Sequence, residues 1–202
     1  MEKIIKLRKL FKTLNLDGYI IPKNNNFFGE YISESEDNLK YISNFTGSAG
    51  FAVILKNKNY MFVDGRYTIQ AGIQCGKQFQ ICTIPKEYPF DIFGKKKLNL
   101  GFDPKLHTEN SLNRLFGKNF TKLKAVNENL IDLLWKREKN SNINFFYSVK
   151  NKDAGLTVEQ KLAMLVKKIK LNKVNYLFTT ASENIAWLLN IRGEDTSYSP
   201  LP

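Results

Sequence analysis

The chain has 202 residues, 43% of them apolar and 13% aromatic, which is enough to bury a core and too apolar for a disordered chain. Two cysteines, Cys75 and Cys82, are too few for a disulfide framework, and without a secretory signal they favour a reducing cytoplasm. The single histidine, His107, argues against sites that need several imidazoles, and no apolar run approaches the roughly 18 residues of a membrane span.

The net charge of +12 does not by itself indicate a nucleic-acid-binding protein. Of the 31 basic residues 26 are lysine, and 22 residues are asparagine, a composition typical of AT-biased coding, whereas phosphate recognition favours arginine. The basic excess lies mainly in residues 1–16 and 136–173 and does not form one strip interleaved with aromatic residues. We therefore expect a solvated basic surface and no specific nucleic-acid partner.

The first fifteen residues place apolar side chains at helical spacing, with lysines between them. A basic amphipathic segment of this kind is also found in transit peptides and membrane-surface helices. We expect a helix docked on the domain, because Asp17-Gly18 ends the pattern and the apolar strand Tyr19–Ile21 follows at once.

Strands alternate with helices as far as residue 135, after a polar loop over Pro22–Asp37. The expected strands are Tyr19–Ile21, Phe51–Leu55, Tyr60–Val63, Phe79–Ile84, Leu98–Phe102 and Leu123–Val126. The expected helices are Asn38–Phe45, Tyr67–Cys75, Tyr88–Phe93, Thr108–Gly117 and Asn127–Trp135. The second and third strands form a hairpin, and the alternation predicts an α/β domain with a mixed sheet flanked by helices.

The pattern changes after this first domain, which we place at residues 1–136. Residues 137–156 are polar and charged and are interpreted as a linker. In residues 157–202 we expect a helix from Thr157, a strand at Val174–Thr179 and a short helix at Asn184–Asn190. The apolar face of the first of these helices carries Leu162, Leu165, Val166 and Ile169.

A short internal repeat links the two parts of the chain. At a constant offset of 146, residues 38–47 align with residues 184–193, with identical Asn, Asn and Gly and four further apolar matches. Each segment follows a helix and a strand. We interpret the repeat as a duplicated domain whose second copy is incomplete.

No residue set forms a complete catalytic, cofactor-binding or metal-binding constellation. The loop Gly47-Ser48-Ala49-Gly50 lacks the spacing of a phosphate cradle, and Ser48 has no suitable histidine. Asp64 and Arg66 are expected to form a structural ion pair, and His107 to be an exposed loop residue. Cys75 and Cys82 lack metal-ligand spacing, and the paired carboxylates Glu36-Asp37 and Glu194-Asp195 are expected in turns and caps.

Several motifs nevertheless resemble the first domain of the three-domain Xaa-Pro aminopeptidases of the creatinase/prolidase superfamily. They are Tyr41–Gly50, Val63–Tyr67 with Gln70-Ala71, Gly101–Pro104, Glu128–Asp132 with Trp135, and Ile185–Gly193. They occur in the order and at the spacing of that family and cover essentially the whole chain. One departure is Leu39-Lys40, where family members often carry arginines.

The resemblance implies a creatinase N-terminal-like fold and an enzyme that releases the N-terminal residue from peptides with proline second. The catalytic chemistry implied by the family belongs to a third domain with two divalent metals, usually manganese, on two Asp, one His and two Glu. None of these ligands can be placed here, so we expect a non-catalytic N-terminal region. Its partners would be its own C-terminal catalytic domain and, through that domain, the peptide substrate, while homodimerisation is left open.

Two alternatives to the enzyme fragment remain, a free-standing binding module and an RNA-associated protein. The chain is either part of such an enzyme or a free-standing α/β module that binds a peptide or protein partner. A basic RNA-associated protein would rest on the net charge alone.

Overall fold

The computed structural model describes residues 2–29, 32–118, 120–137, 145–194 and 199–201. The chain divides into two compact units, Met1–Glu138 and Lys139–Pro202, each of which is described by itself.

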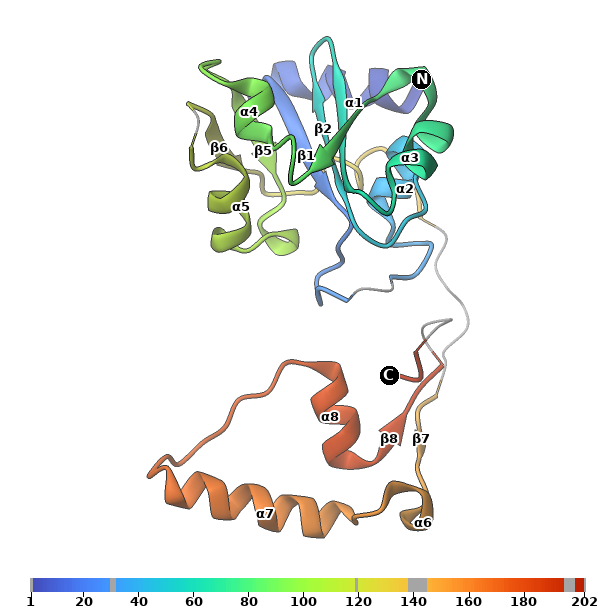
Figure 1. Cartoon of the computed structure of the whole chain (residues 1–202), viewed down its shortest axis with the longest axis vertical. Coiled ribbons are helices and arrows are strands. Elements are labelled where there is room, and N and C mark those ends of the chain that lie inside the picture. The colour runs from blue at the N-terminus through green and yellow to red at the C-terminus, as the bar shows by residue number, and fades with distance from the viewer. Residues whose placement is uncertain (1, 30–31, 119, 138–144, 195–198, 202) are drawn as a thin grey trace. The chain divides into compact units, whose positions relative to one another are not determined.

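Unit 1 is built on a six-stranded sheet with the order β4-β3-β2-β1-β5-β6 (Figure 1). Only β2 runs antiparallel to its neighbours, so the other five strands end at one edge. The strands are β1 (Gly18–Pro22), β2 (Phe51–Leu55), β3 (Asn59–Asp64), β4 (Gln80–Ile84), β5 (Asn99–Phe102) and β6 (Lys122–Ala125). The predicted mixed sheet and the β2–β3 hairpin are confirmed.

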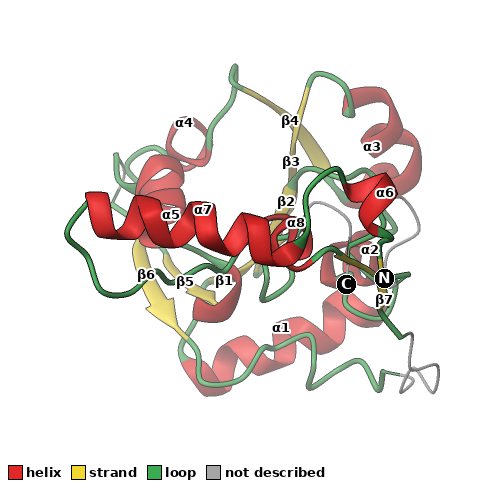
Figure 2. Ribbon diagram, turned by 90° about the horizontal axis from the view of Figure 1, so that it is seen from below, coloured by secondary structure: helices red, strands yellow, loops and turns green. Residues whose placement is uncertain are grey.

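Helices cover both faces of this sheet, as Figure 2 shows. Alternate residues of strands β1 to β4 therefore enter two hydrophobic clusters: Tyr19 and Ile21 of β1 belong to one, and Ile20 to the other. The first cluster lies under α1 (Glu2–Leu14), α2 (Asn38–Ser43) and α3 (Thr68–Cys75), and the second under α4 (Pro89–Phe93) and α5 (Glu109–Phe116). Two single 3-10 turns, η1 (Gly76–Gln78) and η2 (Pro104–Leu106), complete the connections.

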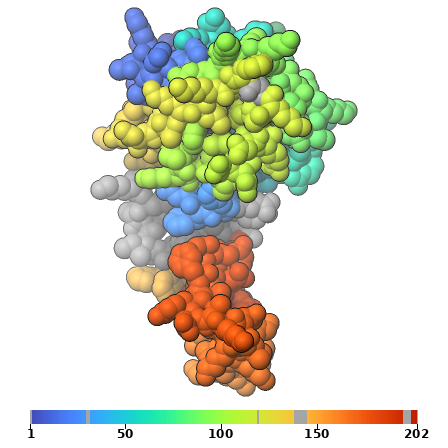
Figure 3. Space-filling view, turned by 90° about the vertical axis from the view of Figure 1, so that its left-hand side faces the viewer, coloured from blue at the N-terminus to red at the C-terminus, as the bar shows by residue number. Residues whose placement is uncertain are grey.

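The edge of the sheet at β6 lies at the surface of unit 1. Figure 3 looks onto this side, where the yellow-green residues of α5 and β6 are visible. Three of the four residues of β6 are exposed, including Lys122 and Lys124. Charged side chains on a short edge strand disfavour further pairing.

The N-terminal helix docks on the domain as predicted, because Ile4, Leu7 and Phe11 of α1 are buried in the first cluster while its lysines face solvent. No helix of the described residues is long and apolar enough to cross a membrane.

The predicted helix over Asn127–Trp135 is wrong. This segment forms a series of turns, because the side-chain oxygen of Asn129 accepts the backbone N–H of Ile131 at 2.9 Å in place of a helical bond. Leu130 and Ile131 are still buried against the sheet. The apolar spacing thus predicted burial correctly and the type of element incorrectly.

Unit 2 contains β7 (Tyr147–Ser148), α6 (Asn151–Ala154), α7 (Val158–Leu171), α8 (Ser182–Leu189) and β8 (Ile191–Arg192). Strands β7 and β8 pair antiparallel. Both β7 and α6 fall in the segment that the sequence suggests is a linker. The predicted strand at Val174–Thr179 is wrong, since these residues pair with no strand in the part of the chain described.

The internal repeat has a structural counterpart. Helix α2 ends at Asn44, with φ of 65°, and α8 ends at Asn190, with φ of 50°. Asparagine tolerates this left-handed conformation better than other non-glycine residues. Asn44 and Asn190, which occupy equivalent positions of the repeat, therefore cap the C-terminal ends of two equivalent helices.

Candidate functional site: a polar pocket at the carboxyl edge of the sheet

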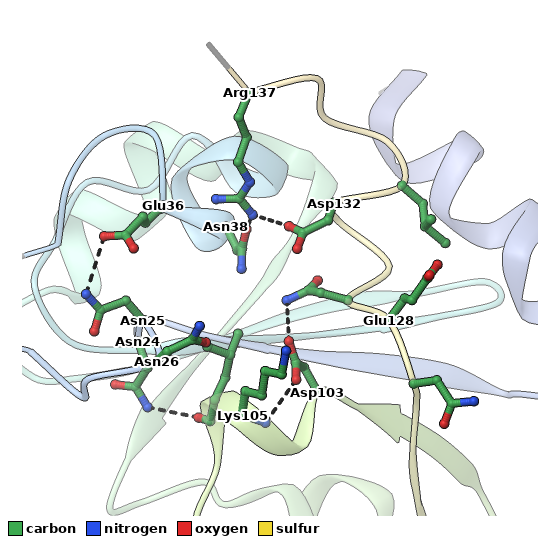
Figure 4. Close-up of a pocket in the computed structure, with 14 residues that line it drawn as sticks. Asn24, Asn25, Asn26, Glu36, Asn38, Asp103, Lys105, Glu128, Asp132 and Arg137 are labelled. Carbon is green, nitrogen blue, oxygen red and sulfur yellow. Dashed lines mark hydrogen bonds and ion pairs between the residues drawn. The ribbon is translucent and has the colours of Figure 1, made fainter. Parts of the chain in front are cut away.

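A pocket of about 570 Å³ lies in unit 1 where the parallel strands β1, β5 and β6 end (Figure 4). Its lining comes from the loops after these strands, namely residues 24–26, 103, 105–106 and 127–129, and from Glu36, Asn38, Asp132, Leu133 and Arg137. Open α/β sheets bind ligands outside the carboxyl ends of parallel strands. Only two of the lining residues, Leu106 and Leu133, are apolar.

One wall of the pocket is a buried polar cluster that joins two of the sequence motifs. Asn129 donates from Nδ2 to Asp103 Oδ2 at 2.9 Å, and Asp103 Oδ1 accepts the backbone N–H of Lys105 at 2.9 Å. The hydroxyl of Tyr19 lies 3.5 Å from Asn129 Oδ1, and burial raises the pKa of this phenol, which keeps it neutral. This cluster ties β1, β5 and the turn after β6 together.

The opposite wall is held by Arg137. Its guanidinium donates to the carbonyl of Ser35 at 2.5 Å and to Asn38 Oδ1 at 2.7 Å, and it pairs with Asp132. Arg137 thereby connects the loop before α2 with the end of unit 1. Because guanidinium groups bind through fixed, directional donors, this contact also fixes the orientation of the Asn38 side chain.

A stack of side chains supports the Arg137 wall from behind. The Arg137 guanidinium lies 4.8 Å from the centre of the Trp135 ring, which stacks on Tyr41 at 4.6 Å. Lys3 Nζ lies over the Tyr41 ring, 4.2 Å from its centre. Cation–π and stacking contacts of this kind contribute about 0.5–1.5 kcal/mol each, so the stack links α1, α2 and residues 135–137.

The loop between β1 and α2 is fixed by an ion pair between Lys23 and Asp37, whose side chains are 7% and 6% exposed. Asp37 also caps α2 by accepting the backbone N–H of Lys40 at 2.9 Å. The paired carboxylates Glu36-Asp37 therefore lie at a helix cap as expected. Of the second pair, Asp195 lies outside the described residues.

The glycine loop has a structural role. A Cβ on Gly47 would lie 2.3 Å from the Phe45 ring, and one on Gly50 would lie 2.9 Å from the carbonyl oxygen of Phe62. Ser48 shares a hydrogen bond of 2.9 Å with the hydroxyl of Tyr67. The expected ion pair between Asp64 and Arg66 forms at 2.7 Å.

The prediction that His107 is exposed is wrong. Its ring is half-buried and packs edge-on against Phe102 at 5.8 Å, and its buried Nε2 has no hydrogen-bond partner in the described part of the chain. Burial lowers the pKa of His107 to about 4. Burial likewise raises the pKa of both Cys75 and Cys82 to about 11, so neither thiol is an activated nucleophile.

Among the residues that the structure describes, no group of three or more His, Cys, Asp or Glu side chains is placed to hold a metal ion. The side chains of this described part of the chain therefore do not fit a dinuclear metal centre.

Sequence reasoning did not single out Asn38, Lys105 and Arg137 as pocket residues. In the sequence, Asn38 is part of the internal repeat, and Glu128–Asp132 is part of the family pattern. The feature of the sequence that could have indicated the pocket is the position of polar residues directly after β1, β5 and β6. The α/β pattern predicts that such strands are parallel and end at the same edge of the sheet.

Unit 1 is thus an α/β domain with a mixed sheet, helices on both faces and a polar pocket at the carboxyl edge. Two family models, both described as the creatinase/prolidase N-terminal domain, match residues 3–130 and 136–202. The chain belongs to this family. The two matches agree with the duplication indicated by the internal repeat.

Relatives resemble the chain along its whole length. Probable Xaa-Pro aminopeptidase P of Laccaria bicolor is 31% identical over 99% of this chain and 33% of its own length. Aminopeptidase P1 of Lotus japonicus is 31% identical over 92% of this chain and 29% of its own length. The chain therefore spans about a third of the length of the curated relatives it matches.

Solved structures of peptidases also resemble this chain. X-prolyl aminopeptidase of Caenorhabditis elegans, described as a cytosolic enzyme with a di-nuclear active site, matches 99% of this chain and 36% of its own with a TM-score of 0.83 and 28% identity. The N-terminal domain of the peptidase PepQ of Mycobacterium tuberculosis matches 66% of this chain with a TM-score of 0.52 at 21% identity, which shows a shared fold.

Proposed function

We propose that the chain is the non-catalytic N-terminal region of a Xaa-Pro aminopeptidase, an enzyme that releases the N-terminal residue from peptides with proline second. The observation that carries the proposal is the similarity over 99% of the chain to proteins named as Xaa-Pro aminopeptidases. In this proposal a further domain on the same polypeptide holds two divalent metal ions. We propose that both are manganese. The named cytosolic relative favours a cytoplasmic location.

The exposed apolar side chains of unit 2 support the proposal that the polypeptide continues after residue 202. Aligned on the tyrosines that follow α1 and α7, residues 175–178 correspond to residues 18–21 of β1. Every residue of β1 is buried between β2 and β5, whereas Tyr176 and Phe178 are 91% and 88% exposed. We propose that residues 137–156 connect the domains, and that residues 157–202 begin a second creatinase-like domain whose later strands pair with residues 174–178.

The coding sequence after residue 202 tests this proposal. We expect it to encode the remaining strands of the second domain and then a domain with two Asp, one His and two Glu as metal ligands. A stop codon directly after Pro202 would contradict the proposal and would favour a free-standing module that binds a peptide or protein partner.

A further inference from the structure

The strongest unassigned feature is the side-chain amide of Asn38 in the pocket wall. Asn38 is only 4% exposed, and its Oδ1 accepts a hydrogen bond from Arg137 at 2.7 Å. A guanidinium only donates hydrogen bonds, so the oxygen must face Arg137 and the nitrogen must face away. Figure 4 shows the Asn38 side chain pointing from Arg137 toward the middle of the pocket.

The nitrogen of this amide has no hydrogen-bond partner among the described residues. Asn38 Nδ2 is not among the buried side-chain atoms that lack a partner, so it is open to the pocket, and a ligand oxygen would there replace a water molecule as its acceptor. The pocket thus presents one oriented donor, and a ligand that offers an oxygen at this point would satisfy it.

The remaining lining limits the class of that ligand. The carboxylates of Glu36 and Glu128 and the ammonium of Lys105 are among the groups that line the pocket, and the Glu36 carboxylate already accepts hydrogen bonds from Asn25 and Ser33. The ligand must therefore carry both donors and acceptors. No aromatic residue is among the lining residues, so the pocket offers no ring on which a nucleobase could stack, and none of the aromatic platforms that commonly hold sugar rings.

An extended peptide meets these requirements, since each peptide group offers one carbonyl acceptor and one N–H donor. A volume of about 570 Å³ is within the range of ligand pockets and accommodates a segment of several residues. We propose that the pocket at the carboxyl ends of β1, β5 and β6 binds an extended peptide, with Asn38 Nδ2 donating to one of its main-chain carbonyls. The proposal deepens and rests on the function proposed above, in that peptides are its substrates, but binding is measurable on this chain alone.

The test is a titration of the ¹⁵N-labelled chain with acetylated, amidated pentaalanine, followed by amide chemical shifts. We expect saturable shifts of the Asn38 side-chain amide and of backbone amides at residues 24–26 and 127–129. Maltopentaose, added at the same concentrations, should cause none. Absence of a saturable shift with pentaalanine at millimolar concentrations, or saturation by maltopentaose alone, would overturn the proposal.

Two matched variants assign the effect to the Asn38 donor. Asn38→Asp keeps an oxygen toward Arg137 and replaces the donor with an acceptor, so pentaalanine should bind about tenfold more weakly or not at all. Asn184→Asp makes the same change at the equivalent, exposed position of the repeat in unit 2 and should leave affinity unchanged. Thermal unfolding verifies that both variants are folded.

Equal affinity of Asn38→Asp and the unmodified chain would remove Asn38 from the site and overturn the proposal. Such a result would leave the proposed aminopeptidase function standing, because that function depends on a domain that the titration does not involve.

Discussion

Gly50 enters β2 with φ of +151°, a backbone conformation that side-chain-bearing residues rarely adopt. A Cβ there would also lie 2.9 Å from the backbone oxygen of Phe62 on the neighbouring strand. We predict that Gly50→Val lowers the free energy of unfolding of unit 1 by about 3 kcal/mol. Gly65→Val, where nothing lies within 4 Å of the added Cβ, is the control. Urea unfolding followed by circular dichroism compares them, and an equal effect of both changes would contradict the prediction.

His107 makes the stability of unit 1 depend on pH. Its pKa falls from the ordinary value of 6.5 to about 4 because the ring is buried, so the unfolded chain binds more protons between these values. Stability is therefore fully present above pH 6.5 and declines as the pH falls toward 4, by at most about 3 kcal/mol. Urea unfolding between pH 4 and 7 should show this slope, and His107→Gln should flatten it. Since the chain has no other histidine, an unchanged slope in the variant would refute this assignment.

At the scale of elements, the segment after β6 is held by isolated turn hydrogen bonds, such as that from Trp135 N–H to the Ile131 carbonyl, and by side-chain contacts. Besides the buried Leu130 and Ile131, Trp135 contributes contacts with Tyr41 and Arg137. We predict that Trp135→Ala lowers the free energy of unfolding of unit 1 by about 2 kcal/mol through lost burial and stacking. Trp187→Ala, in unit 2 and 52% exposed there, is the matched control. Urea unfolding by far-ultraviolet circular dichroism distinguishes the two, and a neutral Trp135→Ala would show that the stack carries little energy.

The regular elements of unit 1 could be predicted because their apolar periodicity matches their burial. The helix expected at Asn127–Trp135 could not be excluded from sequence, because the competing bonds of Asn129, to Ile131 and to Asp103, depend on a residue distant in the chain. The strand expected at Val174–Thr179 has the composition of a strand but no neighbour to pair with among the described residues. Strand formation requires a partner, and composition alone does not supply one.

The candidate site was less predictable than the fold. The pocket depends on three loops that are separated by up to about a hundred residues and meet only because β1, β5 and β6 are parallel neighbours. The orientation of Asn38 depends on Arg137, which is 99 residues away in sequence. Local patterns predict elements, whereas these contacts follow from the topology of the whole sheet.

At the scale of the molecule, unit 2 exposes several large apolar side chains, among them Tyr176, Phe178 and Leu171. We predict that the chain by itself associates through this surface. Sedimentation velocity should show larger species as concentration rises, and Phe178→Glu should reduce them. Phe27→Glu, at a residue that is 85% exposed in unit 1, should not. A chain that stays monomeric at every concentration would argue against this behaviour.

Release of the N-terminal residue from a peptide such as Ala-Pro-Pro is the most direct test of the proposal that the chain is part of an aminopeptidase. The polypeptide encoded by the continuing reading frame should release alanine in the presence of Mn²⁺ and lose this activity when a chelator is added. The 202-residue chain under the same conditions should release none. Chelator-sensitive turnover by the 202-residue chain alone, or no turnover by the longer polypeptide, would contradict the account.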